Sequence, residues 1–204
     1  MNPAEILSRC FISQLTPELQ AICQPFCCGN KDLDDFFQGE YHLYAQKLLG
    51  KTYVLRQKDN LKNIISAFTV SNDSIRIKHL LPEDKAEIEY VTENGEKNLQ
   101  RYPGVLLGRL GTNKNFSKKG YGSATMEFIK SWFRSSSNKT GCRFIIVDAL
   151  NKPDVIHYYI KNGFKFLYGT EQNEAKAMGL NIKKLGTTPL HTRLMYFDLI
   201  EIKN

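Results

Sequence analysis

The segment Ser117–Ala124 carries two lysines and two glycines directly before a run of periodic apolar residues. A glycine pair at a helix N-terminus lets backbone N–H groups converge on an anion, and the helix dipole adds a partial positive charge. Lys118 and Lys119 place two full positive charges beside Gly120 and Gly122. These residue types in this order predict a turn that binds phosphate.

The spacing of the glycines excludes two common nucleotide-binding loops. The chain has no Walker A sequence of the GxxxxGKS or GxxxxGKT kind, so a P-loop NTPase is not supported. Gly122 is followed by Ser123, Ala124 and Thr125, where a dinucleotide-binding fold requires a third glycine. The alternative is a basic turn with ordinary helix-entry glycines, because a short glycine motif is weak evidence by itself.

The segment Asn151–Phe164 has the pattern of a short helix that ends at a glycine, and it contains two adjacent tyrosines. A phenol has a reference pKa of about 10, so Tyr158 and Tyr159 are protonated at pH 7. The pattern by itself favours both as aromatic core residues on a short helix.

Apolar patterns predict the elements that must position these segments. Val105–Gly111 has the pattern of a strand, a helix begins near Gly120, and Cys142–Ala149 has the β-branched content of a buried strand. A strand, a helix and a strand in this order predict a βαβ crossover, and the fold class is α/β or α+β with a mixed sheet. The other predicted elements are helices within 30–49, a hairpin of strands 52–56 and 63–70, a helical or partly ordered insertion at about 80–102, a helix at 153–162, and strands at 164–167 and 193–199.

The composition is that of one globular domain over residues 1–204. Hydrophobic residues make up 42% of the chain and charged residues 24%, and chains of this length commonly fold around one core. No apolar run approaches the roughly 18 residues of a membrane-spanning helix, and the N-terminus lacks the pattern of a secretory signal. We expect a cytoplasmic protein that does not cross a membrane.

The net charge indicates the kind of partner, and the number and spacing of the cysteines argue against disulfides and a metal site. The chain has 28 Lys and Arg against 21 Asp and Glu, a net charge of +7, which favours anionic partners such as nucleotides, cofactor phosphates or RNA. Five cysteines leave one over in any disulfide framework, so disulfides are not expected. Cys23, Cys27 and Cys28 lack a paired CxxC motif or a close histidine, so no metal is predicted.

Three segments, taken together and in order, resemble the GNAT superfamily of N-acetyltransferases. They are Leu107–Thr112, the glycine turn and the tyrosine-containing segment. Gly120 and Gly122 match the superfamily motif Q/R-x-x-G-x-G/A, and Tyr159–Phe164 matches its later motif Y-x-K-x-G-F. Ser117 is a departure, because the superfamily usually has Gln or Arg there.

The resemblance, which covers residues 105–168 best, implies a fold and a cofactor. The implied fold is a mixed, mostly antiparallel sheet flanked by helices, with a βαβ core that binds acetyl-CoA. The pantetheine arm would pair with the strand backbone near Leu110, Asn151 would steady that arm, and the pyrophosphate would rest on the glycine turn. The residues implied to bind the cofactor are Leu110, Gly111, Thr112, Lys118, Lys119, Gly120, Tyr121, Gly122, Ser123 and Asn151.

The resemblance also implies a general acid that protonates the departing CoA thiolate. Counting back four residues from Gly163 selects Tyr159, whereas the usual interval from Asn151 selects Tyr158. Tyr159 is preferred because Gly163 is the nearer anchor. No general base stands out, and the candidates by residue type alone are Asp148, His157, Glu127 and Glu40.

A second resemblance concerns the acceptor. Phe26–Phe37, followed by Lys51–Val54, is similar to the opening of the toxin-type GNAT enzymes that acetylate the amino group of aminoacyl-tRNA. An α-amino group with a pKa of about 7.8 is roughly 14% neutral at pH 7, so it needs less help from a base than a lysine does. We expect an N-acetyltransferase with an amine acceptor, tRNA among the candidates. The alternative is a non-catalytic module of this fold that binds acyl-CoA or RNA. A second copy of the chain, in a homodimer, is a further candidate partner.

Overall fold

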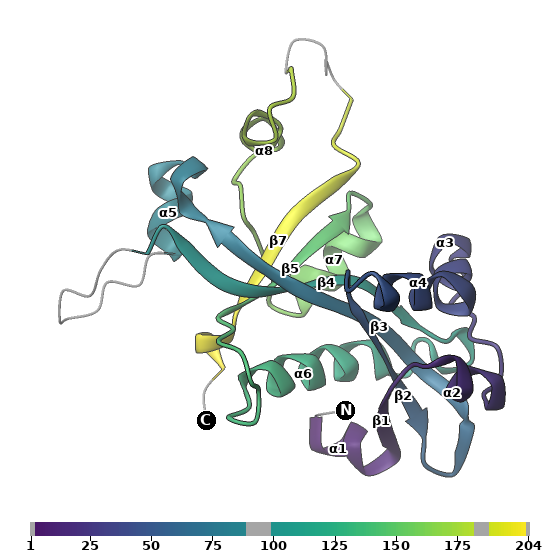
Figure 1. The fold of residues 1–204 in the computed structure, drawn as a ribbon. Helices are drawn as coiled ribbons and strands as arrows, with labels where there is room; N and C mark the ends of the chain where they lie inside the picture. Colours follow the sequence, from purple (N-terminus) through teal and green to yellow (C-terminus); the bar gives the residue numbers. More distant parts are fainter. Residues whose placement is uncertain (1–2, 89–98, 182–187, 203–204) are drawn as a thin grey trace. The chain divides into compact units, whose positions relative to one another are not determined.

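The computed structural model describes residues 3–88, 99–181 and 188–202, and the chain divides into two compact units (Figure 1). One unit comprises residues 1–72 and 106–139, and the other comprises residues 73–105 and 140–204. Strands β3 (Asn60–Arg76) and β4 (Arg101–Thr112) contribute residues to both units. Within the described ranges, no helix is long and apolar enough to cross a membrane.

The first unit contains the strand order β1-β2-β3-β4. Strand β1 (Cys10–Gln14) pairs antiparallel with β2 (Lys51–Gln57), and β2 pairs antiparallel with β3. The β2–β3 pair confirms the predicted hairpin, with Gln57 opposite Asn60 at its turn. Strand β1 was not predicted from the sequence.

Five α-helices and one turn of π-helix among the described residues belong to the first unit. Thr16 and Asn30 are N-caps whose side chains accept hydrogen bonds from Leu19 N and Leu33 N, which fixes where two of these helices begin. A single turn of π-helix then connects two short α-helices of the predicted 30–49 region. The segments are α1 (Pro3–Arg9), α2 (Pro17–Ile22), α3 (Lys31–Asp35), η1 (Phe36–Glu40), α4 (Tyr41–Gln46) and α6 (Tyr121–Arg134).

Aromatic side chains cover both faces of the strands in this unit. Successive residues of a strand point to opposite faces, so Val54 packs with the helices at 17–46 while Tyr53 faces the other way. On that other side, Trp132 of α6 lies 4.8 Å from the ring centroid of Tyr53 and 6.1 Å from that of Phe68. These ring contacts pack helix α6 against strands β2 and β3.

The second unit contains the strand order β4-β5-β7-β6. Strands β5 (Phe144–Leu150) and β6 (Lys165–Phe166) each pair antiparallel with β7 (Thr192–Asp198), and α7 (Pro153–Lys161) packs on β5. These elements confirm the predicted strands and helix between 142 and 199.

Helix α8 (Glu171–Ala177) was not predicted, and an ion pair anchors it to β7. Arg193 Nε donates to Glu174 Oε2 at 2.6 Å, and Leu194 N donates to Glu174 Oε1 at 2.6 Å. Both charged side chains are buried, so removing either one would leave a buried charge without its main partner.

The predicted insertion at about 80–102 divides into several parts. Strand β3 extends to Arg76, η2 (Ile77–His79) and α5 (Pro82–Ile88) follow it, and β4 begins at Arg101. The rest of the insertion, 89–98, lies outside the described residues.

Gly104 allows β4 to approach β5 closely, which yields a test of the second unit. A Cβ at Gly104 would lie 2.9 Å from Phe144 O and 2.9 Å from Ile146 Cδ1. We expect Gly104→Ala to lower the free energy of unfolding by about 1–3 kcal/mol, because backbone or core must shift. The matched control is Gly108→Ala on the same strand, where a Cβ meets nothing within 4 Å. Urea denaturation of both variants measures the difference, and equal stabilities would contradict the close approach.

Candidate functional site

The end of β4 presents the predicted pantetheine-binding residues in the first unit. Thr112 Oγ1 lies 3.5 Å from Ser66 Oγ, which in turn accepts a hydrogen bond from Thr125 Oγ1 of α6. Gly111 faces the opposite side, where a Cβ would lie 3.1 Å from the ring of Phe26. The strand end is therefore fixed on both faces, as a backbone that has to pair with a ligand must be.

Several hydrogen bonds hold the loop from Asn113 to Gly120. Asn113 N donates to Ile65 O at 2.8 Å and Lys114 N donates to Cys27 O at 2.9 Å, so the loop is tied to two separate segments. The hydroxyl of Ser117 donates to Lys114 O at 2.9 Å. Ser117, which departs from the GNAT motif, thus makes its side-chain hydrogen bond within the loop.

Gly120 is the N-cap of α6 and has a left-handed conformation, with φ of 83°. No side chain caps this helix end, and the first helical bond that Gly120 O accepts comes from Ala124 N at 3.1 Å. The first amides of a helix have no carbonyl acceptor one turn earlier within the helix, and Tyr121 N and Ser123 N belong to this first turn. The arrangement suits an anion, because both the amides and the helix dipole favour negative charge there.

Lys118 also has a left-handed conformation, with φ of 58°. A lysine in this region carries a strain of about 1–2 kcal/mol relative to its usual backbone conformations. Left-handed residues in a turn make backbone concavities that bind anions. The predicted turn thus has the backbone geometry of an anion site, with exposed Lys118 and Lys119 beside it.

Tyr159 lies on α7, in the second unit. Its carbonyl accepts from Phe164 N at 3.0 Å across the left-handed Gly163, and its ring centroid lies 5.2 Å from those of Phe164 and Tyr158. Burial raises the pKa of Tyr159 to about 12, so the phenol is fully protonated at neutral pH. Both tyrosines are half-buried, and the choice between them stays a prediction.

Asn151 uses both amide hydrogens inside the second unit. Its Nδ2 donates to Glu171 Oε1 at 3.1 Å and to Leu190 O at 2.9 Å. Hydrogen bonds from Leu190 N and Asn151 lower the pKa of the Glu171 carboxyl. The amide oxygen of Asn151 is the group left to accept from a ligand N–H.

The four candidate bases differ in their surroundings. Burial raises the pKa of the Asp148 carboxyl, and the negative charge of Asp73 raises it further. Glu127 pairs with Lys130 Nζ at 2.6 Å, while Glu40 and His157 are exposed. Asp148 is therefore the candidate base whose carboxyl pKa is raised, by burial and by the charge of Asp73.

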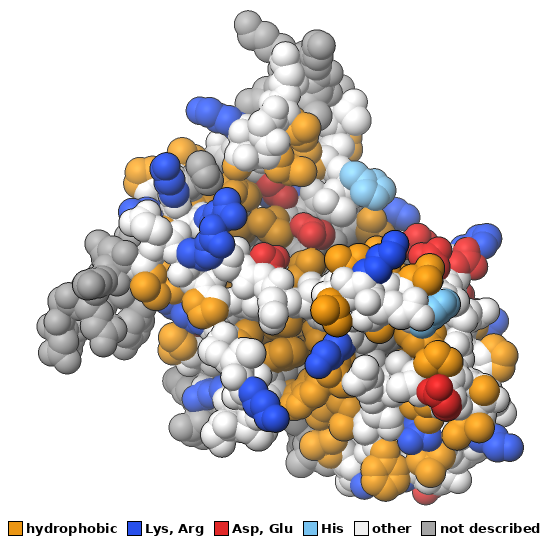
Figure 2. Space-filling view, in the orientation of Figure 1, with side chains coloured by type: hydrophobic (Ala, Val, Ile, Leu, Met, Phe, Trp, Pro, Cys, Tyr) orange, Lys and Arg blue, Asp and Glu red, His pale blue; other side chains and the backbone are white. Residues whose placement is uncertain are grey.

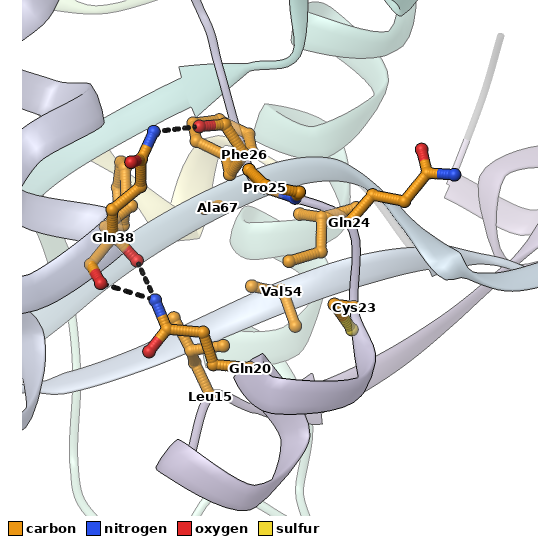
Figure 3. A pocket seen from close by; sticks show the side chains of 11 residues that line it. Leu15, Gln20, Cys23, Gln24, Pro25, Phe26, Gln38, Val54 and Ala67 are labelled. Atoms are coloured by element: carbon orange, nitrogen blue, oxygen red, sulfur yellow. Dashed lines mark hydrogen bonds between the residues drawn. The ribbon is translucent and has the colours of Figure 1, made fainter.

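Two features of the first unit were missed by sequence analysis. One is Arg109, whose guanidinium lies over the rings of Phe36 and Tyr44; a charged residue within an apolar strand was the available signal. The other is a cavity of about 170 Å³ in the aromatic core, in which Gln38 Nε2 donates to Phe26 O at 2.8 Å (Figure 3). None of the predicted site residues lines this cavity.

The cysteines near the cavity have neighbours of their own. Cys27 Sγ lies 3.3 Å from Asp34 Oδ2, and Cys28 N donates to Asp34 Oδ1 at 2.6 Å. Within the part of the chain that the structure describes, no three His, Cys, Asp or Glu side chains are grouped so that they could hold a metal ion.

No protein-family model and no curated protein sequence matches the chain, whereas solved structures do. A tyrosine-to-phenylalanine mutant of KacT superposes with a TM-score of 0.65 at 16% identity, covering 94% of this chain and 96% of that chain. AtaTR bound with AcCoA gives 0.64 at 18% identity, covering 95% of each chain. AtaT complexed with acetyl-methionyl-tRNA gives 0.64 at 18% identity, covering 93% and 94%.

These neighbours include structures described as toxins. Their similarity extends over nearly the whole chain, from the N-terminal segment to the tyrosine-containing helix and beyond. It confirms the fold predicted from the sequence: the chain has a GNAT-type fold of the kind found in the KacT and AtaT toxins.

Proposed function

We propose that residues 1–204 act as one acetyltransferase domain that transfers the acetyl group of acetyl-CoA to a primary amine. The observation that carries the proposal is the uncapped N-terminus of α6 at left-handed Gly120, placed directly after the strand end Leu110–Thr112. This is the arrangement that a pyrophosphate and an amide-containing arm require. The similarity to AtaTR, solved with AcCoA, supports it.

In this proposal the chain positions the thioester and moves one proton. Acetyl-CoA supplies the thioester carbonyl that the amine attacks: a C–N bond forms, the C–S bond breaks, and the amine passes a proton to water. Backbone N–H groups at Leu110–Thr112 stabilise the oxyanion. The hydroxyl of Tyr159 donates its proton to the leaving sulfur. Four of the neighbouring structures, one of KacT and three of AtaT, are of tyrosine-to-phenylalanine mutants, which agrees with a working tyrosine.

We further propose that the acceptor is the α-amino group of an aminoacyl-tRNA. The net charge of +7 favours a polyanion, and Figure 2 shows Lys and Arg side chains spread over the face drawn. AtaT, a structural neighbour, was solved with acetyl-methionyl-tRNA. Because an α-amino group is partly neutral at pH 7, the reaction makes modest demands on a base.

Gly122 provides a test of the phosphate turn. A valine side chain there would occupy space beside the amides of Tyr121 and Ser123, so Gly122→Val should weaken acetyl-CoA binding at least about tenfold while the fold persists. Isothermal titration calorimetry measures the affinity. The control is Gly141→Val, at an exposed glycine where a Cβ meets nothing within 4 Å. Unchanged affinity in a folded Gly122→Val protein would contradict the assignment.

Release of free CoA thiol tests the enzymatic proposal itself. Purified protein is incubated with acetyl-CoA and a panel of polyamines, peptides, small amines and aminoacyl-tRNA. The proposal expects steady thiol release with at least one acceptor. Binding of acetyl-CoA without thiol release for any acceptor would instead favour a non-catalytic module. The observation that supports this alternative is that the hydroxyl of Ser117 donates its hydrogen bond to Lys114 O within the loop.

A further inference from the structure

Arg109 is a cation without a carboxylate partner in the described part of the chain. Its guanidinium carbon lies 3.9 Å from the ring centroid of Phe36 and 5.1 Å from that of Tyr44. Its Nε is buried and has no hydrogen-bond partner. Aromatic faces attract the cation but do not satisfy its N–H donors, so the rings hold the guanidinium in place while its Nε–H still lacks an acceptor.

Four other arginines of the described residues have a carboxylate partner or hydrogen bonds. Arg143 pairs with Asp198 at 2.9 Å, and Arg193 pairs with Glu174 at 2.6 Å. Arg9 pairs with Glu5 at 3.3 Å, and Arg56 donates to Ser13 Oγ and Leu61 O. Arg109 differs in having two aromatic rings and no anion, and a partly buried charge in that state is costly unless a ligand completes it.

The acidic residues nearest in sequence to Phe36 have other partners. Asp34 accepts from Cys28 N and Gly29 N, and Asp35 pairs with Lys31. The anion that completes Arg109 is therefore not supplied by these carboxylates of α3.

The position of Arg109 indicates which ligand it serves. It directly precedes Leu110 on β4, and by strand alternation it shares the face of Gly111, the face towards Phe26 and Cys28. The proposed function assigns the cofactor phosphates to the turn beyond Thr112 and the thioester carbonyl to the backbone of Leu110–Thr112, which Arg109 directly precedes on β4. An aminoacyl-tRNA has no free carboxylate, because its carboxyl group is esterified. Its formal negative charge nearest the amine is the phosphodiester before the terminal nucleoside.

We propose, resting on the proposed function, that Arg109 binds this last phosphodiester of the acceptor RNA and so positions the amine. A guanidinium recognises phosphate through paired N–H donors. The rings of Phe36 and Tyr44 hold the side chain in one orientation, which lowers the entropy lost on binding. Arg109 is a positioning residue that acts on the acceptor and not on the cofactor.

The test compares two RNA probes on the full chain. One is a short oligoribonucleotide ending in CCA, and the other is the same RNA with its last phosphodiester replaced by a neutral methylphosphonate. The neutral linkage should weaken binding to the unaltered protein about 10- to 100-fold. Arg109→Gln should weaken binding of the charged probe by a similar factor and make the two probes equal. Lys58→Gln, which removes another cation from an aromatic ring, should leave the difference between the probes intact.

Several outcomes would overturn the assignment. Equal affinity of the unaltered protein for both probes would do so. So would an Arg109→Gln protein that still binds the charged probe more tightly than the neutral probe by the same factor, or one that loses affinity for acetyl-CoA and not for RNA. If Arg109→Gln does not fold, Arg109→Lys serves, because lysine keeps the charge without the paired donors and should shrink the difference. Since binding is measured without acetylation, a failure of the proposed function is recognised separately, by absence of acetyl transfer.

Discussion

Replacing Tyr159 by phenylalanine should lower kcat about 10²- to 10⁴-fold while leaving acetyl-CoA affinity almost unchanged. The variant loses only the hydroxyl, and the ring still packs on Phe164. Because the proton is needed only as the C–S bond breaks, the loss falls on the transition state. Steady-state thiol release gives kcat, and calorimetry gives the affinity.

The adjacent tyrosine provides the matched control. Tyr158→Phe removes the same atom one residue away on α7 and should change kcat less than about tenfold. If Tyr158→Phe shows the large loss and Tyr159→Phe stays active, the general acid is Tyr158 and the count back from Gly163 selected the wrong residue. The Tyr159 hydroxyl, with its pKa raised to about 12, would then have only a packing role on α7.

Acetylation of sub-saturating aminoacyl-tRNA should fall steeply with added salt. If six or more phosphates are engaged, the rate should drop roughly 10³-fold or more between 50 and 200 mM salt. Binding releases the cations that surround the RNA phosphates, and added salt opposes that release. The positive charge that supplies these contacts is the excess of 28 basic over 21 acidic residues. Initial rates at a fixed low tRNA concentration measure the slope.

A small amine is the control for the salt experiment. It engages no phosphates, so its rate should change little over the same range, and any common loss would report on acetyl-CoA binding instead. A flat profile with aminoacyl-tRNA would contradict an acceptor held through its backbone.

The sequence predicted the parts of the fold that depend on local signals. The turn at Gly120 was predicted because glycines, lysines and a periodic helix follow one another within a few residues, and α6 begins where expected. The β2–β3 hairpin and helix α7 were predicted for the same reason, since turn residues and a glycine C-cap mark their ends. Local chemistry decides these elements.

Elements that depend on distant contacts were missed. Helix α8 is short and polar, and it is fixed by the ion pair of Glu174 with Arg193, 19 residues away. Strand β1 forms by pairing with β2 about 40 residues later, which no local pattern reveals. Arg109 lies within the segment Leu107–Thr112, but the role proposed for it depends on Phe36 and Tyr44, which contact it only in the folded chain.

Radiolabelled acetyl-CoA tests most directly the proposal that the acceptor is the α-amino group of an aminoacyl-tRNA. Purified protein is mixed with radiolabelled acetyl-CoA and a mixture of aminoacyl-tRNAs, and the esterified amino acids are released by mild base and separated. The proposed function predicts label on the α-amino group of one or more released amino acids. Label found only on a polyamine, a peptide or another small amine, with none on the released amino acids, would contradict it.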